Sequence, residues 1–184
     1  MTSQIDHLVL GAEDLSSATQ SLESDFGVPF NVGGEHPVMG THNRLLRLQA
    51  DIYLEVIAAS PTALPQRTRW FSMDDPKTKL RLNQGIHPLC WVLQVKDIHQ
   101  ARKNCGYDPG EVINMSRGDL EWQITVPKDG GLAEGGLLPV LIQWPGGRNP
   151  AHRLTPSPVW LTHLEITHPS PCLLYTSDAA DDVI

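Results

Sequence analysis

A histidine within an apolar run is the first side chain of this sequence that could do chemistry. Residues 4–12 read QIDHLVLGA, and alternation along a strand would place Ile5, His7 and Val9 on one face. On that face the imidazole could be a metal ligand, a catalytic base or a hydrogen-bonded core residue. A neutral imidazole is a good ligand for zinc, iron or manganese. The residue type alone leaves the three roles open.

The carboxylate of Glu55 is a second candidate. It is central in the apolar run Ile52–Ile57, and burying a carboxylate costs free energy unless a cation or several hydrogen-bond donors meet it. A bound metal ion would neutralise the charge of the Glu55 carboxylate. The alternative is a glutamate on an edge strand that faces water.

Ser116 and Arg117 follow an apolar strand start and could bind an anion. The guanidinium group is a rigid fork that suits a carboxylate or a phosphate, so Arg117 would hold the substrate. The alternative is a hairpin arginine in water. Trp70, Phe71 and Trp144 could line a pocket for a flat or apolar group, or they could belong to the core.

The elements that position these side chains form an internal repeat. A shift of 83 residues places Asp14 on Asp97, and apolar residues at helical spacing follow each aspartate. Both segments read as a strand, an aspartate N-cap and a helix, and the helices should end at Gly27 and Gly106. The strands expected after the helices are at 44–48, 51–58, 111–115, 122–126 and 138–144. The order is therefore βαβββ, twice, which indicates a duplicated module.

This repeat predicts how the chain is divided. We expect a first module at 1–60, a linker at 61–87, a second module at 88–147, and at 148–171 a connection with the start of a further strand near His163. The linker is rich in proline and arginine and is long for a compact domain, so it should be a functional lid or a covering loop.

The last residues, 172–184, differ in style from the rest of the sequence. Written back as codons, the stretch CLLYTSDAAD resembles the transposon-end adapter used in sequencing libraries. We expect residues 172–184 to be translated adapter, which is excluded from fold reasoning, and the native chain to continue differently. The fold is then truncated at its C-terminus.

Composition narrows the partners. Fourteen lysines and arginines against 21 aspartates and glutamates give a net charge of −7, which disfavours nucleic acid and anionic membranes. The sequence contains neither a run long enough to span a membrane nor a signal-peptide pattern, and its three cysteines lack CxxC spacing. We expect a cytoplasmic protein. There is no GxSxG elbow, no P-loop and no GxGxxG after a strand.

Seven segments between Ile5 and Pro171 resemble the glyoxalase-like domain family of the vicinal oxygen chelate superfamily. They read IDHLVLGAEDL, GGEHPVMGTHN, YLEVIA, TRWF, INMSR, GGLLPVLIQW and HLEITHPSP. The resemblance implies an α+β fold in which paired βαβββ modules with curved mixed sheets enclose a pocket. Members include lyases, isomerases, ring-cleaving dioxygenases and antibiotic-binding proteins.

The resemblance also implies a divalent metal ion, such as zinc, iron, manganese or nickel, held by side chains of the first and last strands of the modules. The positions that match are His7, Glu55 and Gln143. The second module departs from the family pattern, because the counterpart of His7 is Cys90 and Gln143 takes a position that is usually acidic. His42 could supply an imidazole instead, or make only a strand-entry turn contact.

Two functions follow from the resemblance. One is a metal-dependent lyase, isomerase or dioxygenase that acts on a small molecule with vicinal oxygens, and the other is a metal-free binding protein. His36, before Pro37, should be loop structure, although it could face the pocket. The pocket could form within one chain or between two, so a homodimer stays open. The catalytic residues would be Glu55 and Arg117, and the substrate-binding residues would be His42, Asn43, Ser116, Arg117 and Trp144.

Overall fold

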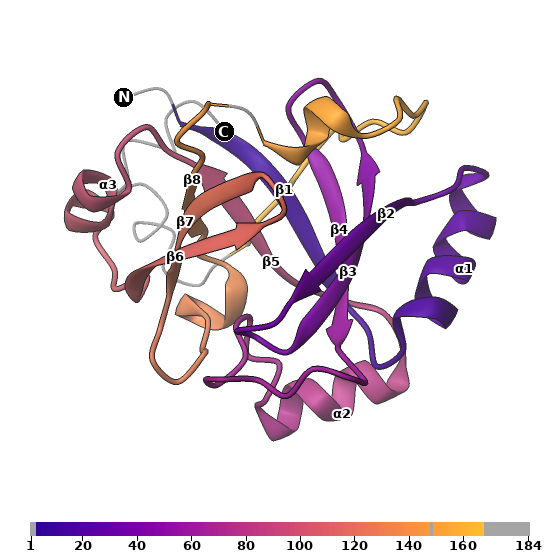
Figure 1. The fold of residues 1–184 in the computed structure, drawn as a ribbon, viewed down its shortest axis with the longest axis horizontal. Helices are drawn as coiled ribbons and strands as arrows, with labels where there is room; N and C mark the ends of the chain where they lie inside the picture. Colours follow the sequence, from indigo (N-terminus) through magenta and orange to yellow (C-terminus); the bar gives the residue numbers. More distant parts are fainter. Residues whose placement is uncertain (1–2, 148, 168–184) are drawn as a thin grey trace.

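The computed structural model describes residues 3–147 and 149–167, and the order βαβββ occurs twice in them (Figure 1). The first half contains β1 (Gln4–Gly11), α1 (Leu15–Phe26), β2 (Asn31–His36), β3 (Thr41–Arg47) and β4 (Tyr53–Ala59). The second half contains β5 (His87–Gln94), α3 (Ile98–Asn104), β6 (Glu111–Arg117), β7 (Leu120–Val126) and β8 (Val140–Gln143). Between the halves lies α2 (Pro76–Gln84), and short 3-10 helices occur at Ala133–Gly136 and Pro150–Arg153.

All eight strands belong to one curled, mixed sheet. Its order is β2-β3-β4-β1-β5-β8-β7-β6, so the two first strands, β1 and β5, pair antiparallel at the centre. Within each half, the first strand runs parallel to the last strand, β1 to β4 and β5 to β8. The sheet curves into a half barrel (Figure 1). The predicted α+β class and the paired arrangement are confirmed.

The helices that begin the repeat form where the sequence predicts them. Asp14 accepts a hydrogen bond from the Ser17 amide at 2.7 Å, and Gly27 ends α1 with a left-handed φ of 67°. Asp97 caps α3 in the same way through the Gln100 amide at 2.9 Å. A side-chain acceptor at the N-cap satisfies one of the free amides of the first turn, so the repeated aspartates have a structural role.

Strand alternation separates two layers of core. Leu54 and Val56 of β4 pack with Leu15 and Leu22 on the convex side under α1, and α3 covers the corresponding side of the second half. The concave side holds the larger cluster, which includes Val9, Ile57, Val92, Met115, Trp122, Ile124, Val140, Ile142 and Trp144. The candidate site lies within this concave cluster, so an apolar wall surrounds its polar groups.

Part of the linker, which the sequence analysis expected to be a lid or a covering loop, is helical. The helix α2 starts at Pro76, with Asp75 as its N-cap. Its sequence, PKTKLRLNQ, buries only Thr78 and Leu82, so it carries little apolar periodicity for a sequence-based prediction to detect. The preceding residues Trp70 and Phe71 are buried against the concave cluster.

The further strand expected near His163 does not form in the described residues. Residues 161–167 are neither helix nor strand, because their backbone pairs with no sheet edge there. Leu161 instead packs beside the convex core, and its carbonyl accepts a hydrogen bond from the Gln49 side chain at 3.2 Å. The adapter-like stretch 172–184 lies outside the described residues.

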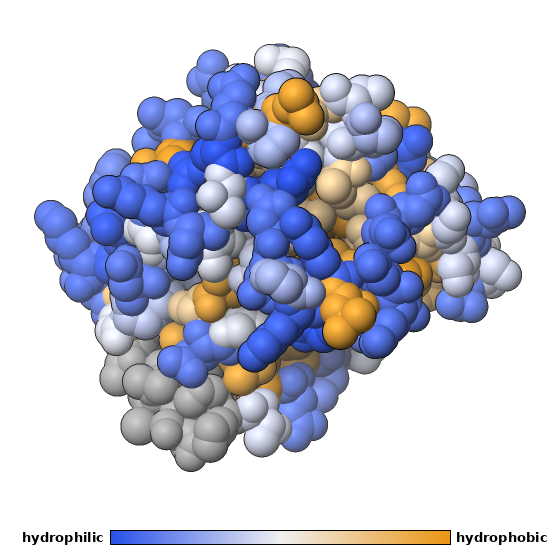
Figure 2. Space-filling model, turned by 90° about the horizontal axis from the view of Figure 1, so that it is seen from below, coloured by the Kyte–Doolittle hydropathy of each residue, from blue (hydrophilic) through white to orange (hydrophobic). Residues whose placement is uncertain are grey.

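The surface on the α2 side is mainly polar, with apolar side chains in small separate patches (Figure 2). Among residues 3–147 and 149–167, no helix has the length and apolar character that a membrane crossing requires.

Candidate functional site

A β-bulge in β1 places the neighbouring side chains of Asp6 and His7 in the site. Ile5 pairs with Leu93 of β5, but His7 pairs with Val92, so Asp6 is an extra residue in the strand. Regular alternation would place Asp6 and His7 on opposite faces, but a bulge changes that alternation. Both side chains are buried, with Asp6 fully inaccessible and His7 only 3% exposed.

Asp6 fixes the orientation of the His7 ring. One carboxylate oxygen, Oδ1, lies 2.6 Å from His7 Nδ1, and Oδ2 accepts hydrogen bonds from Trp144 Nε1 and Asn149 Nδ2, both at 2.9 Å. Tyr53 stacks on the imidazole with a centroid distance of 4.4 Å. With Nδ1 engaged, the other ring nitrogen, Nε2, is directed toward Glu55.

Glu55 meets His7 from the neighbouring strand β4. Its Oε2 lies 3.5 Å from His7 Nε2, and its Oε1 accepts a hydrogen bond from the Asn43 side chain. The carboxylate is 5% exposed, so it needs the donors that a buried charge requires. Asn43 and His7 supply them, and the predicted site residues Asn43 and Glu55 lie together.

Contacts within the row Asp6–His7–Glu55 shift the pKa values of His7 and Glu55. Burial lowers the pKa of His7, but hydrogen bonds and negative charge from Asp6 and Glu55 outweigh it and raise that pKa to about 9. Burial raises the pKa of Glu55, but contact with the His7 cation outweighs it and lowers that pKa to about 2. At neutral pH the structure therefore holds an imidazolium between two carboxylates.

This row predicts a pH dependence of stability. Because the pKa of His7 is raised from 6.5 to about 9, its stabilisation is complete below pH 6.5 and is lost as the pH rises through 9. Because the pKa of Glu55 is lowered from 4.5 to about 2, its stabilisation is present above pH 4.5 and is lost as the pH falls through 2. Urea unfolding should therefore give a free energy of unfolding that falls by a few kcal/mol from about pH 6 to about pH 9.5. The variant His7→Gln should lose this alkaline fall, and an unchanged fall in that variant would contradict the assignment.

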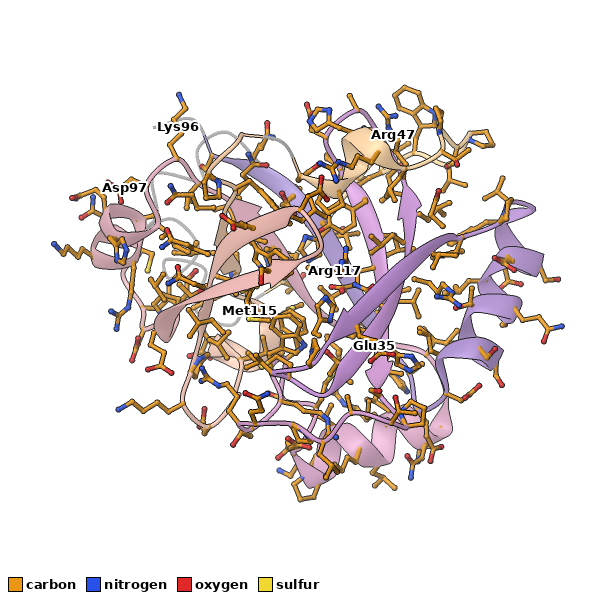
Figure 3. The ribbon with its side chains drawn as sticks, viewed as in Figure 1. Glu35, Arg47, Lys96, Asp97, Met115 and Arg117 are labelled. Carbon is orange, nitrogen blue, oxygen red and sulfur yellow. The ribbon has the colours of Figure 1, made fainter. Side chains whose placement is uncertain are left out.

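Arg117 closes the site from the second half. It ends β6, and its Nη1 donates to Asn43 Oδ1 at 3.2 Å and lies 3.4 Å from His36 Nε2. The side chain thus bridges the β6–β7 hairpin and the β2–β3 hairpin near the middle of the molecule (Figure 3). Burial and then the Arg117 charge lower the pKa of His36 to about 4, against the opposing effect of Glu55. His36 is therefore neutral and accepts from the guanidinium.

Two glycines in β2 make room for this bridge. A Cβ on Gly33 would lie 2.0 Å from Asn43 Oδ1, and a Cβ on Gly34 would lie 2.5 Å from the Arg117 side chain. The Gly34 amide also donates to Asn43 Oδ1 at 2.8 Å. The glycine pair therefore allows the backbone to approach the polar cluster closely.

Replacing Gly33 by alanine should lower the free energy of unfolding by about 1–3 kcal/mol, because the new methyl group would overlap Asn43. Chemical denaturation would measure the loss. Gly146→Ala is the matched control, since a Cβ there meets nothing within 4 Å. Equal stability of the two variants would contradict the close approach.

The polar groups face a small, largely aromatic cavity. Its free space is about 30 Å³, room for about two water molecules. Trp70, Phe71, Trp122 and Trp144 line it beside His7, His36, Asn43, Leu45, Tyr53, Glu55, Arg117, Ile124, Ile142 and Pro150. Trp144 therefore takes the pocket position predicted for it, and its indole nitrogen is bonded to Asp6.

Gln143 does not join the predicted metal ligands. Alternation on β8 places Val140 and Ile142 on the concave side, so Gln143 points to the convex side. There its Oε1 accepts a hydrogen bond from the Ile98 amide at 2.8 Å and caps α3. The prediction that Gln143 is a metal ligand is wrong, because its side chain is on the other face of the sheet.

His42 and Ser116 also lie outside the cavity. They alternate with Asn43 and Arg117 on their strands, so they face outward where their neighbours face inward. His42 Nδ1 is 3.9 Å from a Glu35 carboxylate oxygen on the outer side. The structure therefore corrects both substrate-binding predictions.

The side chains present do not fit a metal ion held by three or four protein ligands. His7 Nε2 and Glu55 Oε2 could share an ion at their 3.5 Å separation, but the second half adds no donor. Cys90 is buried among apolar residues, and burial raises the pKa of its thiol well above the usual value. In the described part of the chain, no three His, Cys, Asp or Glu side chains form a metal-binding group.

Sequence reasoning missed one residue of the site, Asp6, because strand alternation does not predict a bulge. For His36 it favoured a loop before Pro37 and left a place in the pocket open. His36 instead ends β2 and is buried beside Trp70 at a ring distance of 4.9 Å. The one signal for Asp6 was its position next to a strand histidine.

Comparisons with known proteins agree with the fold of this chain. The sequence model of the glyoxalase-like domain matches residues 5–177. A solved methylmalonyl-CoA epimerase in complex with methylmalonyl-CoA and NH4+ is similar, with 15% identity, a TM-score of 0.53, and coverage of 82% of this chain and 100% of that chain. A hypothetical protein from Staphylococcus aureus is similar, with 18% identity and a TM-score of 0.54, over 79% of this chain and 59% of that chain.

A variant of the Streptomyces coelicolor methylmalonyl-CoA epimerase, in complex with 2-nitronate-propionyl-CoA, is similar as well. It has 14% identity and a TM-score of 0.50, over 80% of this chain and 98% of that chain. Similarity at this level of identity shows the fold alone. No curated protein sequence matches the chain.

Proposed function

Because the chain belongs to the glyoxalase-like domain family of the vicinal oxygen chelate superfamily, we propose that it is a small-molecule enzyme of the lyase or isomerase type. It would move a proton on a substrate that carries vicinal oxygens. The observation that supports this most directly is the buried row Asp6–His7–Glu55, of which His7 and Glu55 line one cavity together with Arg117. An acid, a base and a cation in one enclosed site are the groups that proton transfer next to a carbonyl needs.

The contact between His7 and Glu55 supplies the acid and the base. A substrate oxygen that approaches His7 Nε2 would take over its hydrogen bond and separate it from Glu55, whose contact is already long at 3.5 Å. Glu55 would then lose the interaction that lowers its pKa, and burial would make it a stronger base. Glu55 would accept the proton from carbon, while the His7 cation and Arg117 would stabilise the charge on oxygen.

Hydrogen exchange with solvent would test this proposal without knowledge of the full reaction. The purified protein would be incubated in D2O with a panel of 2-oxo acids, 2-hydroxy acids and acyl-CoA thioesters, and ¹H NMR would follow the hydrogen next to the carbonyl or hydroxyl carbon. We expect the protein to accelerate exchange in at least one member. Exchange at the uncatalysed rate throughout the panel would overturn the proposal.

The donor set makes a prediction about metal content. Of the predicted metal ligands, His7 and Glu55 are the two that lie together in the described residues. We therefore expect protein purified without chelators to contain zinc, iron, manganese and nickel well below one ion per chain. Elemental analysis of the wild type and of His7→Ala would measure this. A stoichiometric metal ion that is lost in His7→Ala would contradict the prediction and support the metal-dependent enzyme.

The alternative function is a metal-free small-molecule binding protein on the same fold. The aromatic side chains of the cavity, Tyr53, Trp70, Phe71, Trp122 and Trp144, favour it, since they would hold a flat or apolar ligand by stacking. The exchange experiment separates the two functions when it is combined with a binding measurement. A ligand that binds tightly but exchanges no hydrogen would favour the binding protein.

A further inference from the structure

The positive charge of Arg117 has no negative partner within the described residues. Its hydrogen-bonding contacts are the neutral Asn43 and His36. The two carboxylates of the site are already engaged, Asp6 by His7 and Glu55 by His7 and Asn43. Four other arginines of the described residues pair with carboxylates: Arg67 with Glu111, Arg69 with Asp74, Arg102 with Asp108 and Arg153 with Asp119. A half-buried guanidinium that faces a cavity without a counter-charge is suited to an anionic ligand.

The groups around Arg117 would give way to a carboxylate. Asn43 and His36 hold the guanidinium through two neutral acceptors at 3.2 and 3.4 Å. A carboxylate can replace both with shorter, charge-assisted bonds in a bidentate pair. Asn43 keeps its other bonds, to Glu55 and the Gly34 amide, so the wall of the site would stay in place.

A second unfilled donor lies in the same wall. Trp70 lines the cavity and is 3% exposed, and its Nε1 is buried without a hydrogen-bond partner among the described residues. An indole nitrogen only donates, so an oxygen atom is what it lacks. Since that atom is itself closed to solvent, Arg117 is the group of this wall that calls for a ligand with oxygen acceptors.

The linker limits the size of that ligand. Phe71 and Ser72 have left-handed φ values of 58° and 56°, a costly conformation that turns the Trp70–Phe71 pair into the concave side. The Ser72 amide donates to the Gly130 carbonyl at 2.8 Å, and Arg69 binds Asp74 at 2.8 Å. The aromatic pair is therefore fixed on both sides, and the free space beside it is only about 30 Å³. A small carboxylic acid would enter only as Arg117 turns away from Asn43 and His36 to bind it, and a larger acid would have less room still.

From these observations we infer that the site takes a free, compact carboxylic acid with its carboxylate on Arg117, and that it rejects acids carried as coenzyme A thioesters. The inference rests on the proposed function, because it names the substrate class of the same site. It also sets this chain apart from the epimerases of similar fold, whose solved complexes hold methylmalonyl-CoA or 2-nitronate-propionyl-CoA.

Binding of a matched set of probes to the full chain tests the inference. Malonate, malonamide and malonyl-CoA share one three-carbon core, and oxalate is a smaller dicarboxylate. Titration calorimetry and the fluorescence of the cavity tryptophans would report binding. We expect wild-type protein to bind malonate or oxalate, malonamide to bind roughly 30-fold more weakly than malonate, and malonyl-CoA to bind more weakly than malonate.

Variants would test whether Arg117 is the group that binds the carboxylate. Arg117→Gln should weaken carboxylate binding roughly 30-fold, while Arg117→Lys, which keeps the charge, should recover part of that loss. Arg153→Gln, which removes an exposed arginine paired with Asp119, should bind like the wild type. Circular dichroism would verify that each variant is folded.

Several results would overturn the inference: no binding of either dicarboxylate by the wild type, equal binding of malonate and malonamide, tighter binding of malonyl-CoA, or wild-type affinity in a folded Arg117→Gln. The proposed function fails separately. Carboxylate binding that depends on Arg117 without any hydrogen exchange would leave the inference standing and overturn the function, and exchange on thioesters alone would do the reverse.

Discussion

Replacing Asp6 by alanine is expected to lower the free energy of unfolding by about 3–5 kcal/mol, the cost of breaking a buried charge pair by removing one partner. Asp6 is fully inaccessible. Its loss would leave two buried donors, His7 Nδ1 and Trp144 Nε1, without an acceptor. Asn149 Nδ2 would keep only its hydrogen bond to the Asp51 carbonyl, at 2.7 Å. It would also leave the His7 cation with one carboxylate instead of two. Urea denaturation at neutral pH would measure the change.

Two further variants make this result specific. Asp6→Asn keeps an acceptor for Trp144 and Asn149 and should lose less stability than Asp6→Ala. Asp119→Ala removes an aspartate whose side chain is 75% exposed and bonded to Arg153, so its free energy of unfolding should stay close to that of the wild type. Similar losses in Asp6→Ala and Asp119→Ala would show that the buried network does not stabilise the fold.

Replacing Glu55 by glutamine is expected to reduce hydrogen exchange on the responsive substrate by about 10²–10⁴-fold, the usual contribution of a general base. The amide cannot take up a proton from carbon at neutral pH. Its oxygen can still accept from Asn43, so the side chain would stay in place. ¹H NMR in D2O with a member of the panel that exchanges in the wild type would measure the rate.

The matched control for this change is Glu121→Gln, the same substitution on the exposed side of β7. It should exchange hydrogen at the wild-type rate. Thermal unfolding would show whether Glu55→Gln remains folded. A folded Glu55→Gln with wild-type exchange would remove Glu55 from the reaction and leave His7 as the group to examine.

The sequence was sufficient to predict the fold because its strongest signals are local. The aspartate caps, the glycine that ends α1 and the apolar run of β4 all depend on neighbours a few positions away. Two copies of the pattern indicated a duplicated module, and the resemblance to the glyoxalase-like family implied that the modules pair. The helix α2 was missed because it buries only Thr78 and Leu82, so its position depends on contacts with the rest of the fold.

The site was predicted in part, and the errors have one physical origin. His7, Asn43, Glu55, Arg117 and Trp144 come together as expected. The errors concern which face of a strand a residue occupies. Gln143, His42 and Ser116 each lie next in sequence to a cavity residue but on the opposite face. The reverse error concerns Asp6, which the bulge turns inward. Alternation fixes the faces only when the register is known, and register is a tertiary property.

The bridge made by Arg117 has a consequence for the handedness of any product. In a protein built from two equal halves, a pocket could accept a ligand in either of two orientations. Here His7 and Glu55 stand on β1 and β4 of the first half, and Arg117 stands on β6 of the second. A ligand anchored by its anion would therefore present one prochiral face to Glu55. The duplicated architecture, whose halves have become chemically different, would in this way produce a single enantiomer.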